Sequence, residues 1–203
     1  MSDRKKIFVS VGRYEGPRPE TASFSPPEAP VRKYRSAAEK KVFELLDFKH
    51  VVPPAKWKRI GPEGMSILEA MVGNREEPLR TKAITALVLS GDNQHARLLE
   101  RIISDKSEDN LVRAVAVISL GMSKSPADEP VLRKFVNDED EFIRAKVVEA
   151  LGKVGRDDAR KVLLHAVKDK SPLVSSNARS ALKLMRVRLG QKVGKKARAT
   201  DDD

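Results

Sequence analysis

Apolar residues recur along the chain with the spacing of helix faces, and the same arrangement returns after 33, 31 and 31 residues. Apolar residues stand three, four and seven positions after Arg144, as Val147, Val148 and Leu151. That spacing marks one face of an α-helix. Each copy therefore predicts a first helix, and the anchor and leucine pairs are Arg80 with Leu87, Arg113 with Leu120, Arg144 with Leu151 and Ser175 with Leu182.

A turn and a second apolar pattern follow the first three of these helices. Gly, Pro, Asp and Ser interrupt the apolar pattern in "SGDN", "GMSKSPAD" and "GKVGRDDA", as expected at helix ends. Asp157 and Asp158 stand where a helix begins, so we expect them to cap its free amides. The predicted second helices are "HARLLERIIS", "PVLRKFVN" and "ARKVLLHAVK". Each helix pair leaves an apolar face open until a neighbour covers it, so the pairs must stack.

One further pair is predicted before the first anchor, from "SAAEKKVFELLDF" and "MSILEAMVGN", with Leu46 in the leucine position. A long loop, "KHVVPPAKWKRIGPEG", joins them. Residues 1–35 are rich in proline and are expected to be extended or disordered, and residues 191–203 are expected to form a polar tail. The prediction is an all-α fold, a right-handed α-solenoid of about four to five helix pairs over residues 36–190.

Residues 141–171 resemble the short HEAT-like repeat known from phycobilin lyases and many bacterial and archaeal proteins. The resemblance covers about residues 65–189, and it lies in Ile143-Arg144, Ala150-Leu151-Gly152, Val154-Gly155 and Asp169. It implies an α-solenoid fold and leaves the function open.

In HEAT repeats an Asp and an Arg six positions apart form a hydrogen-bonded ladder between successive repeats. Asp138 and Arg144 keep this interval, Asn74 and Arg80 keep it with a polar substitute, and Asp105 and Arg113 are eight apart. The resemblance therefore implies a structural role for these arginines and for Asp105, Asp138 and Asp169, rather than a role in ligand binding.

The chain is basic, with 40 Lys and Arg against 29 Asp and Glu and a net charge of +11. This balance favours contact with nucleic acid, acidic protein or an anionic surface. The absence of Cys excludes disulfides and Cys-ligated metal sites. No apolar run approaches the roughly 20 residues of a membrane span, so we expect a soluble, cytoplasmic protein.

Basic side chains are predicted outside the helix core on the second helices and on the last helix. They could contact a partner, or form a solvated face. Trp57, between Lys56 and Lys58, suits a stacking platform for an unpaired base, an interface anchor, or a cap over the first helix pair. The candidate partner-binding residues are Arg97, Arg101, Arg133, Lys134, Lys161, Lys168, Arg179, Lys183, Arg186 and Trp57.

Catalysis has little support in the sequence. His50, His95 and His165 lie in different repeats, and no carboxylate cluster has metal-ligand spacing. No metal or cofactor is expected. The favoured hypothesis is a non-catalytic adaptor or scaffold that binds a protein partner within a larger complex through the second helices, with the N-terminal segment as a second contact. The alternatives are a nucleic-acid-binding module and, more remotely, an enzyme resembling a bilin lyase.

Overall fold

The computed structural model describes residues 32–48, 52–91 and 95–198, with side chains as far as residue 190. The chain divides into two units, residues 1–33 and 34–203, and every described helix belongs to the second. The N-terminal segment predicted to be extended therefore lies almost wholly outside the described residues.

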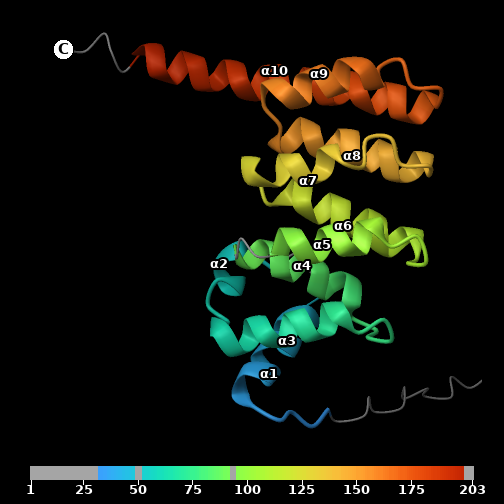
Figure 1. Ribbon diagram of the computed structural model, residues 1–203. Helices are drawn as coiled ribbons and strands as arrows, with labels where there is room; N and C mark the ends of the chain where they lie inside the picture. The colour runs from blue at the N-terminus through green and yellow to red at the C-terminus, as the bar shows by residue number, and fades with distance from the viewer. Residues whose placement is uncertain (1–31, 49–51, 92–94, 199–203) are drawn as a thin grey trace, which may run out of the picture. The chain divides into compact units, whose positions relative to one another are not determined.

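The described part of the chain is a succession of helices without a strand (Figure 1). It contains four helix pairs and a final first helix, which confirms the predicted all-α solenoid. The first helices are α1 (Ala37–Leu46), α4 (Arg80–Ser90), α6 (Asn110–Met122), α8 (Glu141–Val154) and α10 (Pro172–Arg198). The second helices are α3 (Gly61–Gly73), α5 (His95–Ser104), α7 (Glu129–Arg133) and α9 (Asp157–Ala166).

Three elements differ from the sequence prediction. The long loop after α1 contains a short helix, α2 (Pro54–Trp57), and α7 is only five residues long and follows a 3-10 turn, η1 (Pro126–Asp128). The last helix was expected to end near Leu189, but α10 continues to Arg198. Lys, Arg, Gln and Ala dominate this extension and are strong helix formers, so the polar composition that predicted a tail is also compatible with helix.

Side-chain caps begin several helices. Ser36 accepts a hydrogen bond from the Glu39 amide at the start of α1, and Asp140 accepts from the Phe142 amide at 2.8 Å at the start of α8. The prediction that Asp157 and Asp158 cap α9 is wrong, because no side chain at the start of α9 makes a capping bond. Instead, the Glu129 carboxylate of the preceding pair accepts a hydrogen bond from the Arg156 amide at 2.9 Å. The two aspartates lie in the first turn of α9, where negative charge still favours the helix dipole.

The predicted leucine positions form the core of the stack. Leu46, Leu87, Leu120 and Leu151 are each 2% exposed or less. Leu182 in α10 is only partly buried, because α10 is a first helix without a described second helix. The core therefore confirms the repeat register and leaves the last repeat partly uncovered.

Successive first helices pack directly on one another. A Cβ atom on Gly121 in α6 would lie 2.9 Å from Ala150 Cβ in α8, and one on Gly152 in α8 would lie 2.7 Å from Ala181 Cβ in α10. Glycine is required at both positions because the helix backbones approach too closely for any side chain. Each second helix also packs on the first helix of the next pair, so every pair is fixed to its neighbour on two sides.

Candidate functional site

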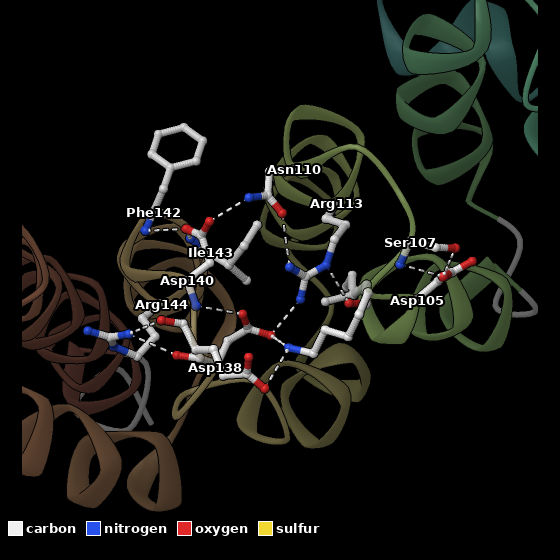
Figure 2. A network of polar contacts seen from close by, with 12 residues as sticks. Asp105, Ser107, Asn110, Arg113, Asp138, Asp140, Phe142, Ile143 and Arg144 are labelled. Atoms are coloured by element: carbon white, nitrogen blue, oxygen red, sulfur yellow. Dashed lines mark hydrogen bonds and ion pairs between the residues drawn. The ribbon is translucent and has the colours of Figure 1, made fainter.

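Arg113 joins three successive segments of the stack (Figure 2). Its Nε donates to the Ile103 carbonyl at 2.8 Å, at the end of the preceding second helix, and its NH2 group donates to Asp138 Oδ2 at 2.5 Å in the following turn. Arg113 and Asp138 are both buried. Arg113 thus supplies a hydrogen-bond donor to a carbonyl at the end of a helix, and its buried positive charge is paired with the buried Asp138 carboxylate.

Arg144 repeats the bridge one unit later. Its guanidinium binds both carboxylate oxygens of Asp169, at 3.0 and 3.1 Å, and donates to the Asp138 main-chain oxygen at 2.8 Å. Asp138 and Arg144, six positions apart, thus take part in a ladder between successive repeats, as the resemblance implied: Asp138 pairs with the Arg113 side chain and Arg144 with Asp169. Arg113 and Arg144 each pair with the aspartate 25 positions later, and each also donates to a backbone carbonyl that precedes it, Ile103 for Arg113 and Asp138 for Arg144.

The first rung of this ladder uses a different acid. Arg80 donates to the Val72 carbonyl at 2.8 Å and pairs with Glu108 at 2.8 Å. Asp105 instead pairs with Arg75 and accepts hydrogen bonds from Ser107. The turn before Arg113 is two residues longer than the corresponding turns of the next two repeats. Glu108 therefore pairs with Arg80 as Asp138 pairs with Arg113 and Asp169 with Arg144.

Ser175 ends the ladder at α10. Its hydroxyl donates to the Val167 carbonyl at 2.8 Å, so it keeps the bond to the preceding helix end that Arg80 and Arg113 make. A serine cannot reach a following turn. The substitution lies in the last described helix, beyond which the described chain offers no carboxylate partner.

The pKa values of the ladder aspartates Asp138 and Asp169 are both lowered. Burial alone would raise the pKa of Asp138, but hydrogen bonds from Lys106, the Asp140 amide and Arg113 outweigh it and lower the pKa. The hydrogen bonds from Arg144 lower the pKa of Asp169, against a smaller opposing effect of burial. These groups form a structural network in which each of the two carboxylates is paired with an arginine.

Residues 103–183 match the family model of HEAT repeats. This segment is an array of HEAT repeats. It includes α6 to α9 and the first part of α10, with both complete Arg–Asp rungs of the ladder. No match to the chain was found among curated proteins. HEAT repeats are generally protein-interaction scaffolds, and the described helices include none long and apolar enough to cross a membrane.

The basic residues predicted on the second helices are at the surface of the HEAT array, but several are paired within the chain. Lys134 binds Glu100 at 2.5 Å and Lys161 binds Asp158 at 3.3 Å. Arg133 is partly buried and lies 3.7 Å from Glu129. These acids neutralise much of the positive stripe that the sequence suggested.

Two shallow depressions lie along the same surface. Arg97 and Arg101 line one of about 560 Å³ with Glu100 and Asp105, and Lys161 and Lys168 line another of about 410 Å³ with the exposed His165. Acids contribute to both linings. The surface is therefore of mixed charge, which suits protein contacts better than a continuous run of phosphates.

Trp57 is buried at 4% exposure and belongs to the core cluster at the start of the stack. Its ring therefore presents no open face on which a base could stack. The helix that carries it, α2, packs on α4, the first helix of the second pair. Trp57 is accordingly removed from the candidate partner contacts.

The last helix carries three of the predicted cations close together. Arg179, Lys183 and Arg186 are exposed on one stripe of α10, and none forms an ion pair within the described part of the chain. Arg186 also lines a depression of about 500 Å³ with Leu164, Leu182 and Leu189, between α9 and α10. Leu164 is 51% exposed. A second helix of a further repeat would cover these residues.

No group of three or more potential metal ligands occurs among the described residues. Buried His95 lies 3.6 Å from Asp128, between α5 and η1, while His165 is exposed on α9. His50 lies outside the described residues. His95 therefore has a buried carboxylate beside it, whereas His165 is at the surface of the stack.

Proposed function

We propose that this protein is a non-catalytic scaffold that binds an acidic surface of a protein partner through the end of its HEAT array. The observation that carries the proposal is the juxtaposition on α10 of three uncompensated cations, Arg179, Lys183 and Arg186, with the apolar depression lined by Leu164 and Leu189. Interface cores combine apolar side chains with arginine in this way. The second-helix surface, with its paired charges, extends the same contact.

The apolar component favours protein over nucleic acid as the partner. Binding to a phosphate backbone depends on cations and does not require exposed leucines. Leu173 and Val187 add further exposed apolar area to α10, at 45% and 50% exposure. Nucleic acid remains the second candidate, because the same three cations would also bind phosphates, and it is an outcome of the experiment below.

The test is affinity capture from native extract with the full-length protein, with and without nuclease. The test variant combines Arg179→Gln, Lys183→Gln and Arg186→Gln. The control combines Lys40→Gln, Lys58→Gln and Lys170→Gln, which removes the same charge from exposed lysines elsewhere. We expect a stoichiometric protein to be retained by wild type and control after nuclease, and lost by the test variant.

Two results would contradict the proposal. Loss of all captured material after nuclease, combined with direct binding of DNA or RNA that weakens as salt rises, would favour the nucleic-acid alternative. Equal retention of the partner by the test variant and the control would show that the α10 stripe is not the contact.

A further inference from the structure

A second apolar groove crosses the carboxyl ends of α4, α6 and α8 and the middle of α10. Its volume is about 680 Å³, and its described lining consists of Pro54, Leu89, Gly121, Met122, Lys124, Lys153, Leu184 and Arg188. None of these residues belongs to the basic stripe of α10 or to the candidate partner-binding residues predicted from the sequence.

The same position of each repeat contributes a lining residue to this groove. Leu89, Met122, Lys153 and Leu184 each stand nine residues after an anchor, in α4, α6, α8 and α10. At 3.6 residues per turn this position is on the side of the helix opposite the core residues. A solvated helix would carry polar residues there, yet three of the four are apolar, and Leu184 is 45% exposed.

The rim of the groove is cationic. Lys124, Lys153 and Arg188 line it, and no carboxylate is among its described lining residues. Lys153 pairs with Glu149 at 2.7 Å, which leaves Lys124 and Arg188 as the less compensated charges.

Lys124 has the backbone conformation of a glycine. Its φ is 55°, and the corresponding residue of the previous repeat, eleven positions after the anchor, is Gly91 with φ 83°. A side chain in the left-handed region is strained. Lysine near a helix end gains some energy from the dipole, but glycine at this position would remove the strain altogether. Lys124 is therefore an exposed cation at the rim of the groove, at a position where the previous repeat has a glycine.

Arg188 is only partly satisfied by its own chain. Its NH2 group donates to the Gly155 carbonyl at the end of α8, while its Nε is buried and has no acceptor. Burial, together with the nearby Arg156, lowers the pKa of Arg188, and the Glu129 carboxylate opposes this shift only in part. An incoming carboxylate would supply the missing acceptor and offset the repulsion between the two guanidinium groups.

We infer that this groove binds a segment of a partner protein in which an apolar side chain is flanked by Asp or Glu, the apolar side chain packing on Leu89, Met122 and Leu184 and the carboxylate meeting Lys124 and Arg188. Charge complementarity determines this choice, since a basic segment would meet repulsion at the rim. The inference rests on the proposed function as a protein scaffold and adds a second contact to it, distinct from the α10 stripe.

The test uses a phage-displayed library of short random peptides, selected on the full-length protein. We expect the selected peptides to combine Asp or Glu with Leu, Ile, Met or Phe. Leu184→Glu should weaken their binding by about tenfold or more, since one buried apolar contact is replaced by a repelling charge. Lys124→Gly and Lys124→Gln should each weaken it several-fold, and only Lys124→Gly should also raise the melting temperature. Lys170→Gln, an exposed lysine in the turn before α10, is the matched control.

Selection of no peptide, or of peptides that bind the groove variants as tightly as wild type, would overturn the inference. Peptides that lose affinity for the Arg179, Lys183 and Arg186 variant but not for the groove variants would overturn it while leaving the proposed function standing. Conversely, the capture experiment could fail while selected peptides still bind at the groove. That result would contradict the proposed contact at α10 and support the inference about the groove. Circular dichroism on every variant ensures that lost binding is not lost folding.

Discussion

The Arg144 guanidinium binds both carboxylate oxygens of Asp169, at 3.0 and 3.1 Å, across the turn that separates two repeats. The same guanidinium donates to the Asp138 carbonyl at 2.8 Å, and the Asp138 side chain in turn binds Arg113. The polar residues of successive turns therefore form a continuous chain along the stack, and each repeat is oriented by the one before it.

Replacing Arg144 with Ala should destabilise the fold strongly. The change leaves Asp169 without its partner and removes a donor to the Asp138 carbonyl, so the free energy of unfolding should fall by about 3 kcal/mol. Arg144→Lys should recover only part of this, because an ammonium cannot bind both carboxylate oxygens as the fork does. Chemical denaturation measures both, with exposed Arg160→Ala as the control. Equal stability of the Arg144 and Arg160 variants would contradict the ladder.

The ladder should also give the protein an acid-sensitive component of stability. The pKa of Asp169 is lowered in the folded state, so its contribution is present above the unfolded value of about 3.9 and is lost as pH falls through the folded value. The difference in melting temperature between wild type and Asp169→Asn should be constant near neutral pH and shrink below about pH 4. A difference that stays constant through this range would show that the charge of Asp169 does not stabilise the fold.

Close packing of the first helices predicts opposite effects for two glycine substitutions. Gly152→Ala would bring a Cβ within 2.7 Å of Ala181 Cβ and 2.8 Å of its Cα. This overpacking should cost about 1 to 3 kcal/mol. Gly73→Ala, where no atom lies within 4 Å, should instead stabilise the protein by about 0.5 kcal/mol through helix propensity. Thermal unfolding compares them, and a stable Gly152→Ala variant would mean that α8 and α10 lie farther apart.

Truncation of a core leucine tests the repeat register itself. Leu151 is fully buried in α8, so Leu151→Ala should cost about 2 to 5 kcal/mol. Leu111, at 63% exposure in α6, offers a matched control, and Leu111→Ala should change stability by less than about 0.5 kcal/mol. Similar melting temperatures for the two variants would argue against the register.

The sequence predicted the fold well because a single spacing, three, four and seven residues after each anchor, defines the core face. It did not predict the partner of each anchor arginine, because the interval of six residues to Asp138 is local while the actual partner of Arg144, Asp169, lies 25 residues ahead. The sequence also does not show which basic residues form ion pairs within the chain. Lys134 pairs with Glu100, which lies on another helix 34 positions earlier.

The residues that form the apolar groove follow a regular spacing in the sequence, but helix prediction uses only the spacing of the core face and does not consider the opposite face. Apolar residues nine positions after the anchors, Leu89, Met122 and Leu184, stand on the outward side of their helices. A single such residue carries little information, since isolated exposed apolar residues are common. Only the stacking of the helices brings three of them together with Lys124 and Arg188.

Hydrogen–deuterium exchange of the full-length protein, with and without the protein captured from native extract, tests the binding of a partner at the end of the HEAT array most directly. The account predicts that the partner slows exchange in residues 157–190, which carry Leu164, Arg179, Lys183 and Arg186, and that nuclease-treated samples show the same protection. Protection confined to helices α1 to α6, or protection produced by nucleic acid alone at low salt and absent with the captured protein, would contradict it.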